Sequence, residues 1–228
     1  MINITLTDQH IARRLSFYLA MEEYVACQQL TDDAFFLWQV EPSVIYGRNQ
    51  VVENEVNMDY CREHGIHIYQ RKSGGGCVYA DRDNLMLSFV TKEKQVGLAF
   101  NRFVNMLLLV LRKMGVEAIG TRHNDIMIGE RKVCGTACRL TPCGCIIHST
   151  MLYDTNMQHM LQAITPTQQK LAKNGVESVR QRITLLKDYT SLTLEEIKGL
   201  IIATLCDSEH LLTEADVIAI EQMELNRM

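Results

Sequence analysis

Three consecutive glycines stand inside a short basic segment, residues 71–76 (RKSGGG), between two runs that read as strands. Glycine has no side chain to pack and loses much backbone freedom on folding, so a folded chain keeps such a run where backbone must approach something closely. Adjacent backbone N–H groups can form a concave anion site, and Arg71 and Lys72 add cationic donors that suit phosphate or carboxylate. The segment predicts a loop that cradles an anionic ligand, with a tight hairpin that uses glycine at positive φ as the plainer alternative.

A second informative segment lies about fifty residues downstream. Residues 125–128 alternate as a strand would, a Gly-Glu pair supplies a turn, and residues 132–137 read as the returning strand of a hairpin. Asn124 and Asp125 at its entrance carry the hard oxygen atoms that Mg²⁺ prefers, and Lys132 is a compact point charge for a phosphate or carbonyl oxygen. Taken singly these residues are ordinary, because an Asn-Asp pair is usually a turn and a lone lysine is usually solvated.

The composition is that of a globular chain with one core. With 228 residues, 47% of them hydrophobic and 22% charged, one domain is the expectation. A formal net charge of −4 argues against a nucleic-acid binder, whose usual footprint is a basic face. We therefore expect no nucleic-acid partner.

The longest apolar run, residues 106–111, is bounded by Arg102 and Arg112 and is far shorter than the roughly twenty residues that span a bilayer. It predicts a core helix and no membrane partner. The first residues lack the basic-then-apolar pattern of a secretory signal, so a cytoplasmic location is expected.

Eight cysteines would form a disulfide framework in a small secreted domain, but no export signal accompanies them here, and reduced thiols are expected. Cys134, Cys138, Cys143 and Cys145 cluster close to His148. Their spacing, C-x3-C-x4-C-x-C, matches none of the regular zinc pairs, so a zinc site is not expected.

Hydrophobic periodicity predicts both helices and strands. Helices are expected over residues 11–29, 56–63, 100–114, 194–205 and 213–224. Strands are expected over residues 35–40, 43–46, 67–70, 85–91 and 146–153. Thr193 and Thr213 are the expected N-caps of the last two helices, and the last third of the chain reads as helical. The sum is an α+β fold, a mixed and largely antiparallel sheet flanked by helices.

Several separated segments, in one order along the chain, resemble the motifs of lipoate-protein ligases. The segments are residues 19–23, 36–38, 47–50, 71–81 with Asn84, 124–125, 132–137, His148 and 170–183. The resemblance covers about residues 10–190 and is specific, because so many separated motifs rarely coincide in one order by chance. On these segments the chain is identified as a member of the lipoate-protein ligases.

The resemblance implies a single catalytic domain over residues 1–228, with the architecture shared with biotin protein ligases. Its core would cover about residues 1–190 and a terminal helical segment residues 191–228. Many of these ligases carry a small C-terminal accessory domain. In this chain that domain is expected to be missing or reduced to the terminal helices.

The resemblance also implies an ATP-dependent ligase that uses ATP and Mg²⁺. Lipoate attacks the α-phosphate of ATP to give lipoyl-AMP, and a lysine of an acceptor protein then displaces AMP. The implied acceptors are apo lipoyl domains of 2-oxoacid dehydrogenase E2 subunits and the H protein of glycine cleavage, and a separate accessory subunit is a further candidate partner. The choice between lipoate and octanoate stays open.

Lys132 is the catalytic residue that the resemblance implies. The residues that it implies around lipoyl-AMP or ATP are Arg71, Ser73, Gly74, Gly75, Gly76, Cys77, Val78, Tyr79, Asn84, Asn124, Asp125, Lys132, Thr136 and Ala137, with Asp125 also holding Mg²⁺. Those that border the acyl chain are Glu22, Trp38 and His148. Burial statistics make Trp38 in a strand more often plain core, and His148 as often a satisfied core histidine. The chain departs from some ligases at Ala80, where they have histidine.

Two alternatives remain at the level of the sequence. Cys145 stands three residues before His148, the offset of the nucleophilic cysteine in related octanoyl transferases, which form a thioester without ATP. Ser149 stands where those transferases have glycine. The other alternative is a noncatalytic module that binds lipoyl carriers, if a missing accessory domain disables adenylation.

Overall fold

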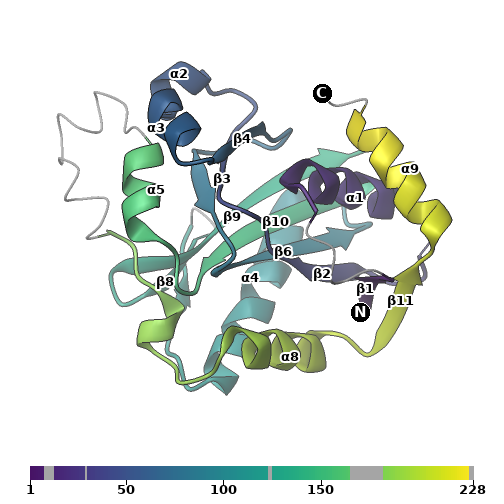
Figure 1. Ribbon diagram of the computed structural model, residues 1–228. Helices are drawn as coiled ribbons and strands as arrows, with labels where there is room; N and C mark the ends of the chain where they lie inside the picture. The colour runs from purple at the N-terminus through teal and green to yellow at the C-terminus, as the bar shows by residue number, and fades with distance from the viewer. Residues whose placement is uncertain (8–12, 29, 123–124, 165–181, 226–228) are drawn as a thin grey trace.

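The computed structural model describes the chain except for residues 8–12, 29, 123–124, 165–181 and 226–228 (Figure 1). Within the described part, eight strands form one large sheet and three form a second, small sheet. Helices cover both faces of the large sheet (Figure 1). The predicted α+β class, with a mixed and largely antiparallel sheet flanked by helices, is confirmed.

The large sheet sets the frame of the molecule. Its spatial order is β11 (Ser208–Leu212), β1 (Ile2–Leu6), β2 (Ala34–Trp38), β6 (Asn84–Thr91), β10 (Gly144–Leu152), β9 (Arg131–Thr141), β8 (Ile126–Ile128) and β7 (Ile119–Gly120). Neighbours from β2 to β7 are antiparallel, whereas β11, β1 and β2 run parallel. All eight residues of β6 are buried, as its nearly continuous apolar run predicts for a central strand covered on both faces.

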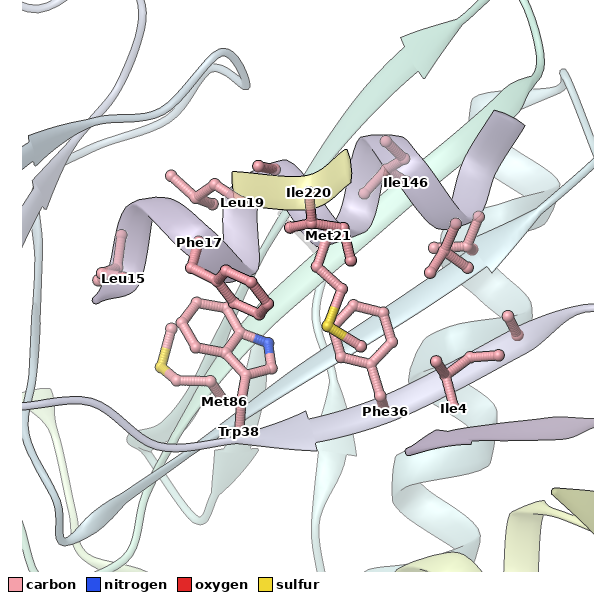
Figure 2. Close-up of a cluster of buried hydrophobic side chains, with 14 of the residues drawn as sticks. Ile4, Leu15, Phe17, Leu19, Met21, Phe36, Trp38, Met86, Ile146 and Ile220 are labelled. Carbon is pink, nitrogen blue, oxygen red and sulfur yellow. The ribbon is translucent and has the colours of Figure 1, made fainter. Parts of the chain in front are cut away.

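One face of the large sheet, here called the α1 face, is covered by α1 (Leu15–Cys27) and α9 (Glu214–Leu225). Figure 2 shows its apolar cluster, in which Phe17 and Met21 of α1 point toward Trp38 and Phe36 of β2. Burial of such aromatic and aliphatic side chains is the main force that holds α1 on the sheet, at about 1.5–3 kcal/mol for each large side chain.

The opposite face, here called the α4 face, is covered by α4 (Val96–Lys113) and α8 (Leu194–Leu205). Phe103, Leu107 and Leu111 recur along α4 at helical spacing and are fully buried against the sheet. Phe103 stacks on Phe89 of β6 with ring centroids 6.1 Å apart. This face is an apolar core.

The small sheet positions the glycine-rich segment. Its central strand β3 (Ser43–Tyr46) pairs in parallel with β4 (His67–Gln70) and antiparallel with β5 (Val78–Ala80). Because β4 and β5 lie on opposite sides of β3, the connection between them must cross the carboxyl end of β3. That connection is residues 71–77, here called the glycine loop. Short helices α2 (Val52–Glu55), α3 (Met58–Glu63) and α5 (Met157–Ala163), together with the 3-10 turn Leu186–Asp188, complete the described elements.

Several sequence predictions of element boundaries are confirmed and others are wrong. Strands 43–46 and 67–70 and helix 194–205 are found as predicted, and Thr193 forms a full capping box with Glu196. The helix expected over residues 11–29 begins only at Leu15 and ends at Cys27. The helix expected over 56–63 is found as α3 but begins only at Met58, and Val56, between α2 and α3, forms a bridge to Ile164.

The last third of the chain is not wholly helical. β11 separates α8 from α9 and pairs in parallel with β1 across more than 200 positions. Four of its five residues are exposed, so its sequence carries no apolar alternation to reveal it. Among the described helices, none is long and apolar enough to cross a membrane.

Candidate active site

Arg71 organises the glycine loop from inside. Its buried guanidinium donates from Nε and Nη2 to the carbonyl oxygen of Gly74 at 3.2 and 2.8 Å, from Nη2 to that of Gly76 at 2.6 Å, and from Nη1 to that of Ile45 at 3.0 Å. Four of its five N–H donors are thus used by backbone. Burial lowers the pKa of Arg71, because the cation has been removed from water. The hydrogen bonds of Arg71 therefore fix the shape of the glycine loop.

Two glycines let the loop pass close to β3. Gly75 has φ +96°, which side chains rarely adopt, and a Cβ there would lie 2.9 Å from Arg71 Nη2. A Cβ on Gly47 would overlap the carbonyl oxygen of Gly75. By contrast, a Cβ on Gly74 or Gly76 would meet no described atom within 4 Å. The close backbone approach predicted from the glycine run is therefore made to Gly47, while two of the three glycines face open space.

Five side chains form a buried hydrogen-bonded set, here called the polar network. Trp38 Nε1 donates to Ser88 Oγ at 2.8 Å, and Ser88 Oγ donates to Glu22 Oε1 at 2.7 Å. Glu22 Oε2 lies 3.0 Å from His148 Nδ1, and His148 Nε2 lies 2.8 Å from Ser73 Oγ. The network crosses from β2 through β6, α1 and β10 to the glycine loop, so it ties that loop to the large sheet.

The direction of the polar network follows from its first member. An indole N–H can only donate, so Ser88 Oγ must accept from Trp38 and use its own proton toward Glu22. An ionised Glu22 only accepts, so Nδ1 of His148 carries a proton. With a neutral ring, Nε2 then accepts from Ser73. These proton positions are assigned from the hydrogen bonds.

The Lys132 side chain packs over Gly135 of the same strand, β9. Its Nζ lies 2.8 Å from Asp125 Oδ1, and both side chains are partly exposed. A Cβ on Gly135 would lie 2.8 Å from Lys132 Cε and 2.9 Å from Nζ, so only glycine at 135 leaves room for this position of the lysine. The β8–β9 register shifts between Ile126 and Met127, a bulge of the kind that re-aims side chains.

A cavity of about 130 Å³ lies between the glycine loop and the hairpin of β9 and β10. Predicted site residues that line it are Trp38, Arg71, Gly75, Gly76, Cys77, Val78, Lys132, Thr136, Ala137 and His148. Ser73 and Glu22 stand next to it through the polar network, and Asp125 through Lys132. Trp38 is both core and cavity wall, because it is 4% exposed and stacks on Tyr18 with ring centroids 4.8 Å apart.

Among the predicted residues, Gly74, Tyr79 and Asn84 do not line the cavity. Asn84 is fully buried; its amide donates to the Tyr79 carbonyl oxygen at 3.3 Å, and its side-chain oxygen accepts from Thr155. Tyr79 packs beneath the small sheet and is 1% exposed. Both side chains serve packing in this structure, and a contact of Asn84 and of the backbone at Tyr79 with the nucleotide stays a prediction. Asn124 and most of the 170–183 segment lie outside the described residues.

Sequence reasoning missed Ser88, Gly47 and Gly135. Ser88 is a small polar residue inside the apolar run of β6, a signal that a buried hydroxyl must find partners. Gly47 and Gly135 lie in two of the segments that resemble the ligase motifs, but no role was predicted for either glycine. Their signal is a glycine close to a lysine or to another glycine-rich segment, because glycine lets another part of the chain approach closely.

The comparisons with known proteins show the family of the chain. Residues 15–206 match the family model described as the lipoyl protein ligase A/B catalytic domain. The chain belongs to this family. Lipoate–protein ligase 1 of Staphylococcus aureus is 32% identical over 213 residues, covering 90% of this chain and 65% of that protein. Lipoate-protein ligase LplJ of Bacillus subtilis is 31% identical over 220 residues, covering 92% and 66%.

This lipoyl protein ligase A/B catalytic domain thus spans slightly less than two thirds of the length of those curated relatives. A solved structure is similar over nearly all of it. A bi-partite lipoate protein ligase of Thermoplasma acidophilum, described with its E2 lipoyl domain, superimposes with a TM-score of 0.84 at 24% identity. The match covers 98% of this chain and 91% of that one, and it shows a common fold.

The cysteine of the transferase alternative lies on the wrong face of this lipoyl protein ligase A/B domain. Cys145 and His148 are three residues apart on β10, and an odd spacing puts side chains on opposite faces of a sheet. Cys145 is fully buried on the α4 face and does not line the cavity. Burial raises the pKa of its thiol, which disfavours the nucleophilic thiolate. The prediction that Cys145 could serve as nucleophile beside Lys132 and His148 is not supported by this geometry.

The other cysteines give no metal centre. All eight carry free thiols, and no three His, Cys, Asp or Glu side chains of the described residues are grouped to share a metal ion.

Proposed function

We propose that this chain is the catalytic domain of an ATP-dependent lipoate–protein ligase. In the proposed reaction it forms lipoyl-AMP from lipoate and ATP and transfers the lipoyl group to a lysine of an acceptor protein. The environment of Lys132 is the observation that most directly supports the proposal. A lysine clamped by Asp125 over Gly135 supplies a fixed positive charge beside a cavity walled by the glycine loop.

In this proposal Lys132 acts by electrostatics. Negative charge builds up where the carboxylate meets the α-phosphate, and again on the acyl oxygen when the acceptor amine attacks. A fixed cation at that point stabilises both transition states, and loss of one such donor typically costs about 2.7–4 kcal/mol. The ion pair with Asp125 fixes the ammonium in place before the reactants arrive.

Asp125 also fits the role of Mg²⁺ ligand. It presents a partly exposed carboxylate, and Mg²⁺ usually takes only one or two protein carboxylates together with substrate phosphates and water. When bound, the ion would supply charge neutralisation on the phosphates. The carboxylate of Asp125 would then hold both the ion and the ammonium group of Lys132.

In this proposal, Trp38 and His148 of the polar network form the part of the cavity wall that borders the acyl chain. The Trp38 indole offers an apolar surface, and its N–H is already satisfied by Ser88, so no polar group of the indole is left to face an alkyl chain. His148 and Ser73 present the polar edge of the same wall. The glycine loop and the first residue of β5 form the remaining wall and would contact the acyl-adenylate through backbone at 75–78.

The proposed acceptor is an apo lipoyl domain of a 2-oxoacid dehydrogenase E2 subunit, with the glycine cleavage H protein as a second acceptor. The Thermoplasma protein is described as bi-partite and is matched along almost its whole chain, which supports a separate accessory subunit here as well. Eight free thiols suit a reducing compartment, so the proposal includes a cytoplasmic location.

The test is mass spectrometry of an apo lipoyl domain incubated with this protein, lipoate, ATP and Mg²⁺. We expect lipoyl-AMP in the mixture and a lipoyl adduct on one acceptor lysine, both lost when ATP is omitted. A parallel reaction supplies octanoyl carrier protein in place of lipoate and ATP. Transfer only in that reaction would replace the ligase by a transferase. Lipoyl-AMP without transfer, restored by an added accessory protein, would support the bi-partite arrangement.

A further inference from the structure

Two exposed cysteines face each other away from the cavity. Cys27 is the last residue of α1, and Cys143 lies in the turn between β9 and β10. Their Sγ atoms are 3.6 Å apart, although the residues are separated by 116 positions. Both are exposed, and neither lines the cavity.

The facing position follows from how α1 lies on the hairpin of β9 and β10. Glu23 and Cys27 are four residues apart, so they share one side of α1. Glu23 pairs with Arg139 of β9 at the first point of contact. Cys27 meets Cys143 one helical turn further along. The two elements therefore touch at successive points, by an ion pair and then by two thiols.

Both cysteines stand on backbone that is held in place. The Cys143 N–H donates to Thr141 Oγ1 at 3.2 Å, and Thr141 Oγ1 donates to the Gly144 carbonyl oxygen at 2.9 Å. Gly144 has φ +137°, and a Cβ there would overlap the Thr91 carbonyl oxygen, so the turn is packed against the end of β6. On the other side, Gln28 N–H caps α1 at the Val25 carbonyl oxygen, 3.1 Å away. A bond between the thiols would join two fixed points.

We propose that Cys27 and Cys143 form a reversible disulfide when a low-molecular-weight disulfide is present as oxidant. One protein thiolate attacks a sulfur of the oxidant and releases its other half as a thiol. The second protein thiolate then attacks the resulting mixed disulfide and releases the remaining half. Two protein thiols lose two electrons and two protons, and one small disulfide becomes two thiols. An S–S bond is about 2.05 Å long, so the sulfur atoms need to approach by only about 1.5 Å.

The bond would clamp α1 to the hairpin without entering the site. α1 carries Glu22 of the polar network, and the hairpin carries Lys132 and His148. Since the cysteines already meet, the oxidised form keeps these contacts in place. A disulfide that closes a loop of more than 100 residues strongly restricts the unfolded chain, so the clamp should stabilise the protein. The proposal is independent of the reaction proposed above.

The test starts from the full chain, reduced and then incubated with glutathione disulfide. After alkylation of free thiols, peptides are mapped without reduction. We expect a linked pair of peptides containing Cys27 and Cys143, and a chain lighter by two hydrogen atoms. Tm should rise by about 5 °C or more and return to its starting value with dithiothreitol. Partial burial, and then the neighbouring thiol, raise the pKa of Cys27, so oxidation should quicken as the pH rises.

Variants separate this pair from the other thiols. C27S and C143S should each abolish the linkage and the gain in Tm, whereas C206S, at a half-buried cysteine on another surface, should keep both. Separate glutathione adducts without a link, a bond between two protein molecules, or free thiols at every pH would overturn the proposal. So would a bond between Cys138 and Cys145, a second pair of neighbouring thiols. A Cys27–Cys143 link that leaves Tm unchanged would refute the clamp.

Discussion

Successive side chains of β10 point to opposite faces of the large sheet, and the two faces differ in polarity. On the α1 face, His148 joins a polar network that reaches the glycine loop. On the α4 face, Cys145, Ile147 and Met151 are buried in an apolar core. The comparison teaches that nearness in sequence to a site residue does not place a side chain in the site. Alternate side chains of one strand face the apolar core and the polar network.

The two faces should respond differently to mutation. Substitutions on the α4 face remove packing and should lower the free energy of unfolding. Substitution of Lys132 beside the cavity should lower the proposed activity of molecules that remain folded, whereas loss of a buried hydroxyl from the polar network should also lower the free energy of unfolding. Four predictions test this division, in order of decreasing effect.

Phe103→Ala should have the largest effect, because it opens a cavity in the α4 face where Phe103 stacks on Phe89. We expect a loss of about 3–5 kcal/mol in the free energy of unfolding, measured by urea denaturation. The matched control is Leu109→Ala on the same helix, where the side chain is exposed and the change should stay within about 0.5 kcal/mol. Equal losses in the two variants would remove the distinction between buried and exposed sides of α4.

Lys132→Ala should lower kcat/KM for lipoyl transfer about 10²–10³-fold while the protein stays folded. Lys132 is partly exposed and its partner Asp125 can be hydrated, so little stability is at stake. Arg131→Ala is the control, since the neighbouring cation donates to the Tyr189 hydroxyl at 3.1 Å. A folded K132A protein with normal transfer, or an R131A protein equally impaired, would remove Lys132 from its proposed role.

Ser88→Ala should cost about 1–3 kcal/mol in unfolding free energy, because it leaves the Trp38 N–H and an oxygen of Glu22 without their partner. Ser149→Ala is the comparison on the α4 face. The buried Ser149 Oγ is without a conventional partner among the described residues and meets only the weakly hydrogen-bonding thiol of Cys134, so its removal should cost less than that of Ser88. Denaturation curves that rank these two serines in the opposite order would contradict the network as drawn.

Cys145→Ala should have the smallest effect. Loss of one buried sulfur from the α4 face should cost about 1 kcal/mol of stability, and ATP-dependent transfer by folded protein should persist. Intact-mass analysis should find no acyl group on this cysteine in the wild type. An octanoyl adduct on Cys145 formed without ATP, with an inactive C145A variant, would reverse the assignment of the two faces.

The local features of the site could be predicted from the sequence, because each lies in one short segment. The glycine loop, the 126–137 hairpin and Lys132 stand out by residue type and spacing, and strands 43–46 and 67–70 follow from alternation with flanking turns. What these segments touch could not be predicted in the same way. Arg71 looked like a ligand for an anion, yet its donors go to loop carbonyls that no sequence pattern reveals.

Long-range pairing explains the remaining misses. β11 is a strand because β1 offers it an open edge, and no pattern within its five residues signals that partner. Ser88 becomes the centre of the polar network only when β2, β6 and α1 come together. The buried contacts of Asn84 with Tyr79 and Thr155 likewise carry no signal in the sequence. Such tertiary context decides what a polar side chain contacts.

The four hydrogen bonds of Arg71 have a consequence for binding thermodynamics. A glycine-rich loop in solution would have to give up much conformational entropy when it closes on a ligand. Here part of that entropy is given up when the protein folds, since the Arg71 side chain holds the carbonyl oxygens of Gly74 and Gly76. A ligand that meets an already ordered loop keeps more of its contact energy as affinity. Calorimetry of an Arg71→Lys variant should therefore show weaker binding with a more unfavourable entropy, even where every other contact is retained.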